Sequence, residues 1–490
     1  SLTYFYSSAI KSQRGKGVEM DEGLSVSLPQ TAAPRQEVAE SGLTVIDHSA
    51  ALLQQLEALL ARGNISDVAL RVQTAGSDRV KAFQVHALVL SLQSEVLRDL
   101  VQSHSSGILV LEESPECADV FDKFIRYLYC GEITVRLDQA LPLHKLASKY
   151  HVRGLQTGLS LYMTQHLAAD VPGGHVAGWY QYAVEAGDAV LRDSCLQYLA
   201  WNLSAVIQSG GWTGLDEELL LTLLRRSDLV LRSELELFEA LEEWMARNQP
   251  GALTAESALR AVRYAMIPPL ELFRLQKQSA ALARYGESVR DLLHMAYQFH
   301  SASPLQLAKY FDVNCSLFAP RNYLSPVWGS PWVIGNPARD DRSGSFQTQL
   351  GPSAHDAGKR LTWNVLFSPR WLSGAPRPTF AEQGAVQGPH AADGSPPLKE
   401  GHPCVMVTPA TSSADLAGVS FQKTVIVLAR PQGKAVVRHI YNFHQSTDET
   451  GDFLADADLQ RRTSEYLIDG SLYLHVVVKP LYHSLVVTRK

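Results

Sequence analysis

The sequence predicts a multidomain α+β protein: a mixed α/β domain, then an all-α domain, then an antiparallel β-sandwich. Short alternating strands are interspersed with helical segments up to about residue 168. The apolar spacing then becomes helical throughout, and after about residue 303 it changes to a period of two, with turn residues between the runs. We place the domains at 44–168, 169–302 and 303–490, because 490 residues suit about three domains.

The composition is that of an ordinary globular protein and argues against two kinds of partner. Apolar residues make up 46% of the chain and charged residues 19%, with a net charge of −6. No segment is strongly basic, so nucleic acid is not an expected partner. No run of about 18 apolar residues occurs, so no membrane span is expected. The chain begins with Ser1 rather than Met, which leaves open whether a signal peptide precedes it.

An amphipathic helix is predicted just after the N-terminal segment. Residues 1–43 mix Ser, Gly, Pro and charges without periodicity, so we expect disorder there. The helix follows a cap at Asp47 or Ser49 and stops at Gly63. Its apolar stripe consists of Leu52, Leu53, Leu56, Leu59 and Leu60. Soluble monomers rarely expose such a stripe, so it covers either its own domain or a second copy of the chain, and we expect a homodimer interface.

The first domain is predicted to combine three strands with further helices. The strands lie at 66–73, 82–85 and 108–111. The first strand directs Val68, Leu70 and Val72 inward. One helix is expected to run through Leu88, Leu92, Val96 and Leu100. Another begins at Ser114–Pro115, ends at Gly131, and buries Val120, Phe121, Phe124 and Leu128.

The remaining chain divides into a helical part and a β-rich part. Helical spacing runs from His175 to about Ser301, with Ser233 and Glu236 at capping-box spacing. Residues 368–404 are rich in Pro and Gly and are predicted to form a loop. The predicted strands lie in 361–367, 418–429, 434–444, 465–479 and 482–489. Asp469-Gly470 between two of these runs predicts a two-residue hairpin.

Ordered motifs then indicate a family. "GNISDVALRV", "FQVHALVLSLQSEV", "FDKFIRYLYCGEI" and "LHKLASKYHVRGLQ" resemble a BTB/POZ domain in order and spacing. "AVEAGDAVLRDSCLQYLAWNL" and "VRYAMIPP" resemble a BACK domain, and "LTWNVLFSPRW" with "SEYLIDGSLYLHVVV" is similar to TRAF/MATH-type sandwiches. The whole order resembles the branch of the BTB–BACK family that is like galectin-3-binding protein. The resemblance implies a non-enzymatic protein-interaction scaffold.

The resemblance also assigns structural roles within the BTB domain. It implies a core formed by Asp67, Phe83, His86, Leu90, Phe124 and Tyr127. His86 lies where a strand meets a helix and is expected to pack and bond locally, because no nucleophile or carboxylate lies at workable spacing for catalysis. Many BTB domains place Lys or Arg directly after this His, whereas this chain has Ala87. A charged pocket at the dimer seam is therefore not expected.

No catalytic, metal or cofactor site is predicted. The sequence has no HExxH, GxSxG or Walker motif. The five cysteines show no CxxC spacing, and we expect buried free thiols. His439 and His444 are five residues apart in one strand run, so their rings should point to opposite faces rather than share a metal.

Two roles and two compartments remain open at this point. Many BTB–BACK proteins are cullin-3 adaptors that use a hydrophobic-x-Glu motif, but here "LVQSHSSGILV" contains no Glu. An intracellular cullin-3 ubiquitin-ligase adaptor is therefore the alternative to a secreted, self-associating scaffold. Three N-x-Ser sequons begin at Asn64, Asn202 and Asn314, and each is predicted at the end of an element. With the resemblance to secreted relatives, they favour an extracellular glycoprotein whose other protein partners are unknown.

Overall fold

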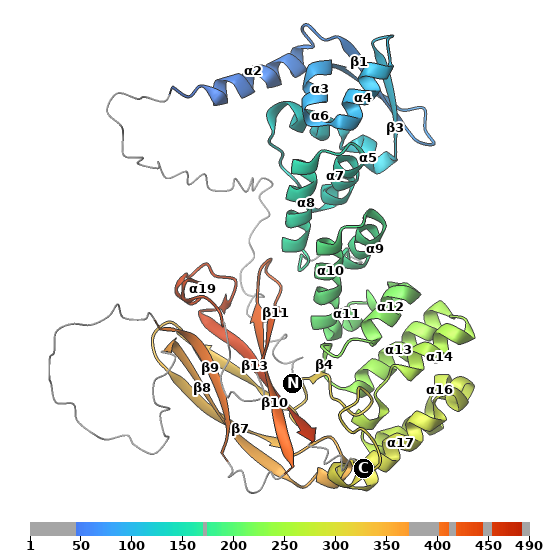
Figure 1. Cartoon of the computed structure of the whole chain (residues 1–490), viewed down its shortest axis with the longest axis vertical. Helices are drawn as coiled ribbons and strands as arrows, with labels where there is room; N and C mark the ends of the chain where they lie inside the picture. The colour runs from blue at the N-terminus through green and yellow to red at the C-terminus, as the bar shows by residue number, and fades with distance from the viewer. Residues whose placement is uncertain (1–45, 170–173, 372–400, 411–417, 444–452, 483–490) are drawn as a thin grey trace, which may run out of the picture. The chain divides into compact units, whose positions relative to one another are not determined.

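A computed structural model describes residues 46–169, 174–371, 401–410, 418–443 and 453–482 (Figure 1). The described chain forms two compact units. One contains the residues up to Leu167 together with Gly178–Asp193, and the other contains the remaining described residues. The segment predicted to be disordered, 1–43, lies outside the described residues, as does most of the predicted 368–404 loop.

The first unit contains a three-stranded sheet in the order β2-β1-β3. Strand β1 (Val68–Thr74) pairs antiparallel with β2 (Val80–Val85) and parallel with β3 (Ile108–Glu113). The predicted alternation is confirmed, since every second β1 residue from Val68 to Thr74 is buried. The alternating strands therefore bury one face, as their sequence pattern predicts.

Two of the helices predicted in this unit are each divided into two, whereas the first helix stops at Gly63 as predicted. Their bounds are α2 (Ser49–Arg62), α3 (Ala87–Gln93), α4 (Glu95–Ser103), α5 (Pro115–Asp119), α6 (Phe121–Cys130), α7 (Leu137–Lys149), α8 (Arg153–Gln165) and α9 (Val176–Ala186). The single helix predicted through Leu88 and Leu100 is wrong. Ser94 is extended there, and its hydroxyl accepts from the N–H of Leu97, which ends α3 and caps α4. Leu88 and Leu92, both on α3, are 70% and 75% exposed.

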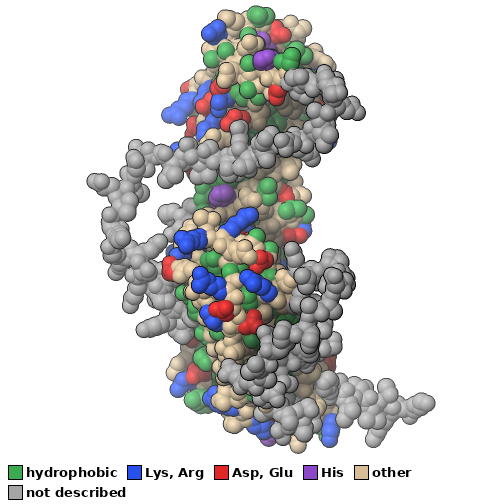
Figure 2. Space-filling model, turned by 90° about the vertical axis from the view of Figure 1, so that its left-hand side faces the viewer, with side chains coloured by type: hydrophobic (Ala, Val, Ile, Leu, Met, Phe, Trp, Pro, Cys, Tyr) green, Lys and Arg blue, Asp and Glu red, His purple; other side chains and the backbone are tan. Residues whose placement is uncertain are grey.

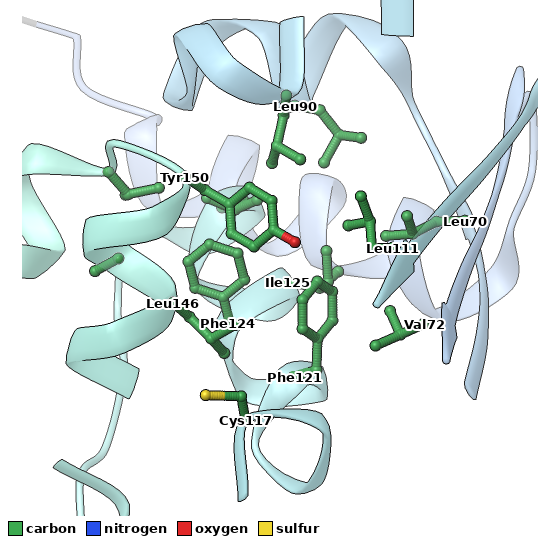
Figure 3. Packing of buried hydrophobic residues seen from close by; sticks show 14 of the residues in the cluster. Leu70, Val72, Leu90, Leu111, Cys117, Phe121, Phe124, Ile125, Leu146 and Tyr150 are labelled. Carbon is green, nitrogen blue, oxygen red and sulfur yellow. The ribbon is translucent and has the colours of Figure 1, made fainter. Parts of the chain in front are cut away.

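The core of the first unit lies between the sheet and α6 and α7. Figure 3 shows the rings of Phe124 and Tyr150 together, with Leu70 and Leu111 entering from the strands. The two ring centroids lie 5.7 Å apart. The predicted inward residues of α6 are all buried, although the helix is interrupted at Val120. Ser114, Pro115 and Gly131 occupy the predicted cap positions.

The middle of the chain is helical, as predicted. The bounds are α10 (Ala189–Trp201), α11 (Leu203–Gln208), η1 (Trp212–Gly214), α12 (Glu217–Leu224), α13 (Glu234–Asn248), α14 (Ala252–Arg260), η2 (Tyr264–Met266), α15 (Pro269–Gln278), α16 (Ala280–Tyr285), η3 (Gly286–Val289), α17 (Arg290–Ser301) and α18 (Pro304–Leu307). Ser233 caps α13 by accepting from the N–H of Glu236. The Glu236 carboxylate accepts from the N–H of Arg232, one residue before the position that a capping box uses.

The C-terminal part contains two antiparallel sheets and is a β-sandwich. One sheet has the order β11-β10-β13-β12, with β6 also paired to β13, and the other has the order β7-β8-β9. The bounds are β6 (Gly329–Gly335), β7 (Arg342–Gln349), η4 (Ala354–Asp356), β8 (Arg360–Trp371), β9 (His402–Pro409), β10 (Val419–Ala429), β11 (Val436–Asn442), α19 (Asp456–Gln460), β12 (Leu467–Ile468) and β13 (Ser471–Tyr482). The sheets enclose a shared apolar core that includes Trp363, Phe367, Leu474 and Val476.

Two details of the sandwich test the sequence predictions. The hairpin at Asp469-Gly470 is confirmed: Ile468 pairs with Ser471, and the turn residues have φ of 53° and 77°. The predicted loop boundary at 368 is wrong, because β8 continues through Trp371 and β9 already starts at His402. The strand predicted at 482–489 lies outside the described residues beyond Tyr482, where β13 ends.

A short parallel ladder ties the helical part to the sandwich inside the second unit. Strand β4 (Val230–Leu231) pairs with β5 (Asn322–Tyr323). Glu234 of α13 lies just beyond β4, and Arg321 lies just before β5. Their side chains are therefore brought close together although they are far apart in sequence.

Candidate interaction surfaces and buried polar sites

Helix α2 carries the predicted leucine stripe, and the structure divides that stripe in two. Leu56 and Leu60 pack partly against the core of their own domain. Leu52 and Leu53 are 59% and 44% exposed, Leu59 is partly exposed, and no residue of α2 is buried. The stripe therefore attaches the helix to its own domain and also leaves apolar surface uncovered.

Further exposed aliphatic side chains lie close to α2 in sequence and on α3. Ile65 is exposed in the turn after α2, and Leu88 and Leu92 are exposed on α3. The turn and α3 are connected directly, because Nε2 of His86 lies 2.7 Å from the backbone oxygen of Asn64. Exposed apolar side chains on adjoining elements indicate an interaction surface rather than a solvated face.

His86 is a local organiser of this turn. Its Nε2 faces a carbonyl oxygen and must therefore carry the hydrogen, so Nδ1 accepts from the hydroxyl of Tyr129 at 2.8 Å. The same hydroxyl accepts the backbone N–H of His86 at 2.9 Å. Both ring nitrogens are thus used in holding the strand-to-helix junction, which is the local bonding role predicted from the sequence.

The other residues assigned to the BTB core fall into three groups. Leu90 and Phe124 are fully buried, whereas Phe83 and Tyr127 are partly buried. Asp67 is exposed, so its assignment to the core is wrong. Its carboxylate instead accepts the N–H of Ala87 at 2.8 Å, at the start of α3. The position where many BTB domains carry a basic side chain therefore offers a backbone donor to Asp67.

A buried polar chain links α7, α8 and the start of α10, and the sequence analysis missed it. His144 exposes no surface, and its Nδ1 and Nε2 lie 2.8 Å from the hydroxyls of Tyr182 and Ser160. Ser160 donates to Asp188 at 2.7 Å. Asp188 also caps α10 through the N–H of Leu191.

The direction of the hydrogen bonds in this chain follows from its members. Ser160 uses its only hydrogen on Asp188, so Nε2 of His144 must donate to Ser160. Burial lowers the pKa of His144, and the neutral ring then accepts from Tyr182 at Nδ1. In a catalytic triad the His takes the proton of the Ser, whereas here the Ser gives its hydrogen to the carboxylate. The three residue types therefore form a structural chain in which Ser160 is not activated as a nucleophile.

In the second unit, a buried ion pair joins the helical part to the start of the sandwich. Arg321 and Glu234 expose no side-chain surface and lie 3.1 Å apart. Arg321 also donates to the carbonyl oxygens of Leu224 and Ala261. Its guanidinium is thus bonded on several sides, as a buried cation requires.

The three sequons lie in different environments. Asn64 is exposed. Asn314 is also exposed, although its amide exchanges two hydrogen bonds with the backbone of Tyr482. Asn202 is buried, with its side-chain nitrogen and oxygen both bonded. The side chains of Asn64 and Asn314 therefore lie at the surface, whereas that of Asn202 does not.

The described residues contain no group of three metal-ligating side chains. His439 bonds to the hydroxyl of Tyr466 at 2.6 Å, and His444 lies outside the described residues. Cys117, Cys195 and Cys404 are buried, as expected, whereas Cys130 and Cys315 are only partly buried. Among the described helices, none has the length and apolar character to cross a bilayer. On the face that Figure 2 presents, Lys and Arg side chains are mixed with Asp and Glu rather than joined into a basic surface.

Comparison with known proteins identifies all three domains. The BTB/POZ domain profile matches residues 56–167, the "BTB And C-terminal Kelch" profile matches 176–277, and the "BTBD17 TRAF domain" profile matches 318–482. BTB/POZ domain-containing protein 17 of Mus musculus is 60% identical over 94% of this chain and 95% of its own length. The chain belongs to the BTB/POZ domain-containing protein 17 family.

The chain is also similar to a human member of this family and to a more distant protein outside it. The Homo sapiens BTB/POZ domain-containing protein 17 is 59% identical over 95% of this chain and 96% of its own length. Galectin-3-binding protein of Bos taurus is 31% identical over 67% of this chain and 58% of its own length. The BTB/POZ domain-containing protein 17 family is thus a group of BTB–BACK protein-interaction scaffolds related to galectin-3-binding protein. The resemblance read from the sequence, including the BTB, BACK and TRAF-like order, is confirmed.

Proposed function

We propose that this protein is a secreted, N-glycosylated scaffold that self-associates through its BTB domain and presents its β-sandwich to other proteins. The observation that carries the proposal is the uncovered apolar surface of α2 and α3. Leu52, Leu53, Leu88 and Leu92 are all exposed in a single chain. We assign a second copy of the chain as the partner that covers this surface. The leucine stripe of α2 packs against its own domain at Leu56 and Leu60, and the same stripe continues to the exposed Leu52 and Leu53.

Light scattering on the purified full chain tests self-association. Leu52 and Leu53 are the residues to change, because both are exposed and their replacement leaves the own-domain contacts of Leu56 intact. The double variant Leu52→Asp, Leu53→Asp should convert a dimer into a monomer. Leu253→Asp is the matched control, since Leu253 is 80% exposed on α14, away from the BTB sequence. A mass that stays doubled in the double variant would contradict the proposal.

The proposal of secretion is supported by the accessible sequons and the family relationship. Asn64 and Asn314 are exposed, as an acceptor of a glycan must be. The relationship to galectin-3-binding protein favours the extracellular compartment for this chain. Expression from the complete natural transcript should place the protein in the medium with a band that shifts on enzymatic deglycosylation. A cell-retained, unshifted product would contradict the proposal.

One observation favours an intracellular cullin-3 adaptor as the second candidate. Cys117, Cys130 and Cys315 are free thiols, which is typical of a reducing compartment. Affinity capture of the cell-retained protein with purified cullin-3 tests this role. The adaptor should bind with a defined stoichiometry, whereas the secreted scaffold should not.

A further inference from the structure

Asn202 occupies the corner between α10 and α11, at the first position of a sequon. Only 4% of the residue is exposed. Its Nδ2 donates to the carbonyl oxygen of Tyr198 at 3.1 Å. Its Oδ1 accepts the backbone N–H of Val437 at 2.8 Å, across 235 residues of sequence. The amide thus connects the helical part of the second unit to a strand of the sandwich.

The bond from Val437 satisfies a backbone donor at the edge of a sheet. Strand β11 is the outer strand in the order β11-β10-β13-β12. An edge strand presents N–H groups that no neighbouring strand accepts, and a buried one requires another acceptor. Val437 is buried, and Asn202 supplies that acceptor.

The neighbours of Asn202 are bonded within the helical part of the unit. Nε1 of Trp201 donates to Asp228 at 2.9 Å. The hydroxyl of Ser204, the third residue of the sequon, donates to Glu236 at 2.9 Å. Both polar residues of the sequon are therefore already bonded within the folded unit.

We infer that Asn202 is a docking residue that holds the edge of the sandwich against the helical part, and that its glycosylation and this docking exclude each other. Glycosylation forms a bond between Nδ2 and the anomeric carbon of a lipid-pyrophosphate-linked oligosaccharide. Nδ2 loses a proton and the lipid pyrophosphate leaves. A sugar on this buried nitrogen has no space beside Tyr198 and Val437, so a modified chain cannot close the corner.

Because the chain is synthesised from its N-terminus, glycosylation of Asn202 could occur before the docking contact forms. Asn202 emerges long before Val437, so the sequon is complete before β11 exists to cover it. Chains that escape modification at Asn202 reach the docked arrangement described above, and modified chains do not. The glycan part of this inference rests on the proposed entry into the secretory pathway. A heterologous cleavable signal peptide separates it from the question of native secretion.

Two measurements on the full chain test the inference. In the first, the chain is secreted behind the heterologous signal peptide, and the occupancy of each sequon is measured by mass spectrometry after deglycosylation in ¹⁸O-labelled water. We expect substantial occupancy at Asn64 and occupancy of roughly a tenth or less at Asn202, because only exposed acceptors stay compatible with the fold. High occupancy at Asn202 in folded protein whose β11 exchanges as slowly as in unglycosylated protein would overturn the inference.

The second measurement needs no glycan. Hydrogen exchange of peptides covering β11 is compared in unglycosylated Asn202→Leu and Ser204→Ala chains. Asn202→Leu removes the acceptor of the Val437 N–H and should speed exchange in β11 by roughly 5- to 10-fold, as expected for one net hydrogen bond. Ser204→Ala destroys the sequon but keeps the Asn202 amide, so β11 should retain its protection. Unchanged exchange in Asn202→Leu would overturn the docking role, whatever the compartment of the native protein.

Discussion

Nε of Arg321 lies 3.1 Å from the Glu234 carboxylate, and neither side chain exposes any surface. The same carboxylate accepts the backbone N–H of Arg263 and the hydroxyl of Tyr323. One acidic group therefore compensates a buried cation, satisfies a backbone donor and bonds a buried phenol. Its position after β4, opposite the start of β5, places it where the helical part gives way to the sandwich.

Replacing Glu234 with Gln should destabilise the second unit by about 3–5 kcal/mol, because it leaves the buried Arg321 without its counter-charge. The free energy of opening can be measured by hydrogen exchange in peptides of α13 and β5. The exposed pair Arg260–Asp291 supplies the control, and Asp291→Asn should cost less than about 1 kcal/mol. If the two substitutions lower the free energy of opening equally, burial does not determine how much the Glu234–Arg321 pair contributes to stability.

The chain from Tyr182 through His144 and Ser160 to Asp188 yields a second prediction. His144→Phe keeps a ring in the buried site but removes the hydrogen bonds that the hydroxyls of Tyr182 and Ser160 make to the imidazole. We expect a loss of about 1–3 kcal/mol in the first unit. Faster hydrogen exchange in α8 and α9 would report it. Ser66→Ala is the control, since the bond from the Ser66 hydroxyl to Gln84 is long and exposed.

Much of the architecture follows from local patterns. The alternation at Val68–Val72, the caps at Ser114 and Gly131 and the Asp469-Gly470 turn each depend on a few neighbouring residues. Such features are readable because the physical cause lies within the segment itself. The order of the three domains follows from the same periodicities and was predicted correctly.

The features that the sequence did not predict depend on contacts distant in the chain. Ser94 breaks a helix where its hydroxyl donates to the carbonyl of Tyr150. Asn202 was predicted at the end of an element, yet it is buried and accepts a hydrogen bond from the distant Val437. Likewise, the separation of Leu52 from Leu56 into exposed and partly buried positions depends on where α2 packs. The spacing of the leucines predicts an apolar stripe on the helix, but it does not predict which other residues the stripe contacts.

Strand β13 also has a feature that the spacing of its residues does not predict, and it leads to two further predictions. Its residues Leu474, Val476 and Val478 face the sandwich core, and alternation would direct His475 and Lys479 to solvent. Both are nevertheless buried, and His475 borders a small cavity together with Leu324. The second face of this strand is thus covered by other parts of the unit.

Lys479→Met should stabilise the protein. Burial, followed by the nearby charge of Arg263, lowers the pKa of Lys479 to about 8. The folded state therefore binds this proton less well than the unfolded chain, in which the value is near 10.5. At pH 7 the side chain is charged in both states, so its removal should raise the free energy of unfolding by about 1–3 kcal/mol. Thermal unfolding at pH 7 measures this, and a lower midpoint in the variant would contradict it.

Acidification should destabilise the sandwich through His475. Burial lowers the pKa of His475 to about 3, from 6.5 in the unfolded chain. Between these values the unfolded chain binds one more proton than the folded chain. The contribution of His475 to stability is therefore complete above pH 6.5 and falls by about 1.4 kcal/mol for each pH unit below it. From pH 7 to pH 5 the loss should reach about 2 kcal/mol.

His475→Phe removes this titration while keeping an aromatic ring in the site. The pH dependence of the opening free energy, measured by hydrogen exchange in β13, should be shallower in the variant than in the unchanged chain. His300 and His439 also have pKa values lowered by burial, so they keep part of the slope in both proteins, and the difference between the two curves isolates His475. Parallel curves between pH 7 and pH 5 would mean that the unfolded and folded chains bind protons at this residue equally, in conflict with its burial.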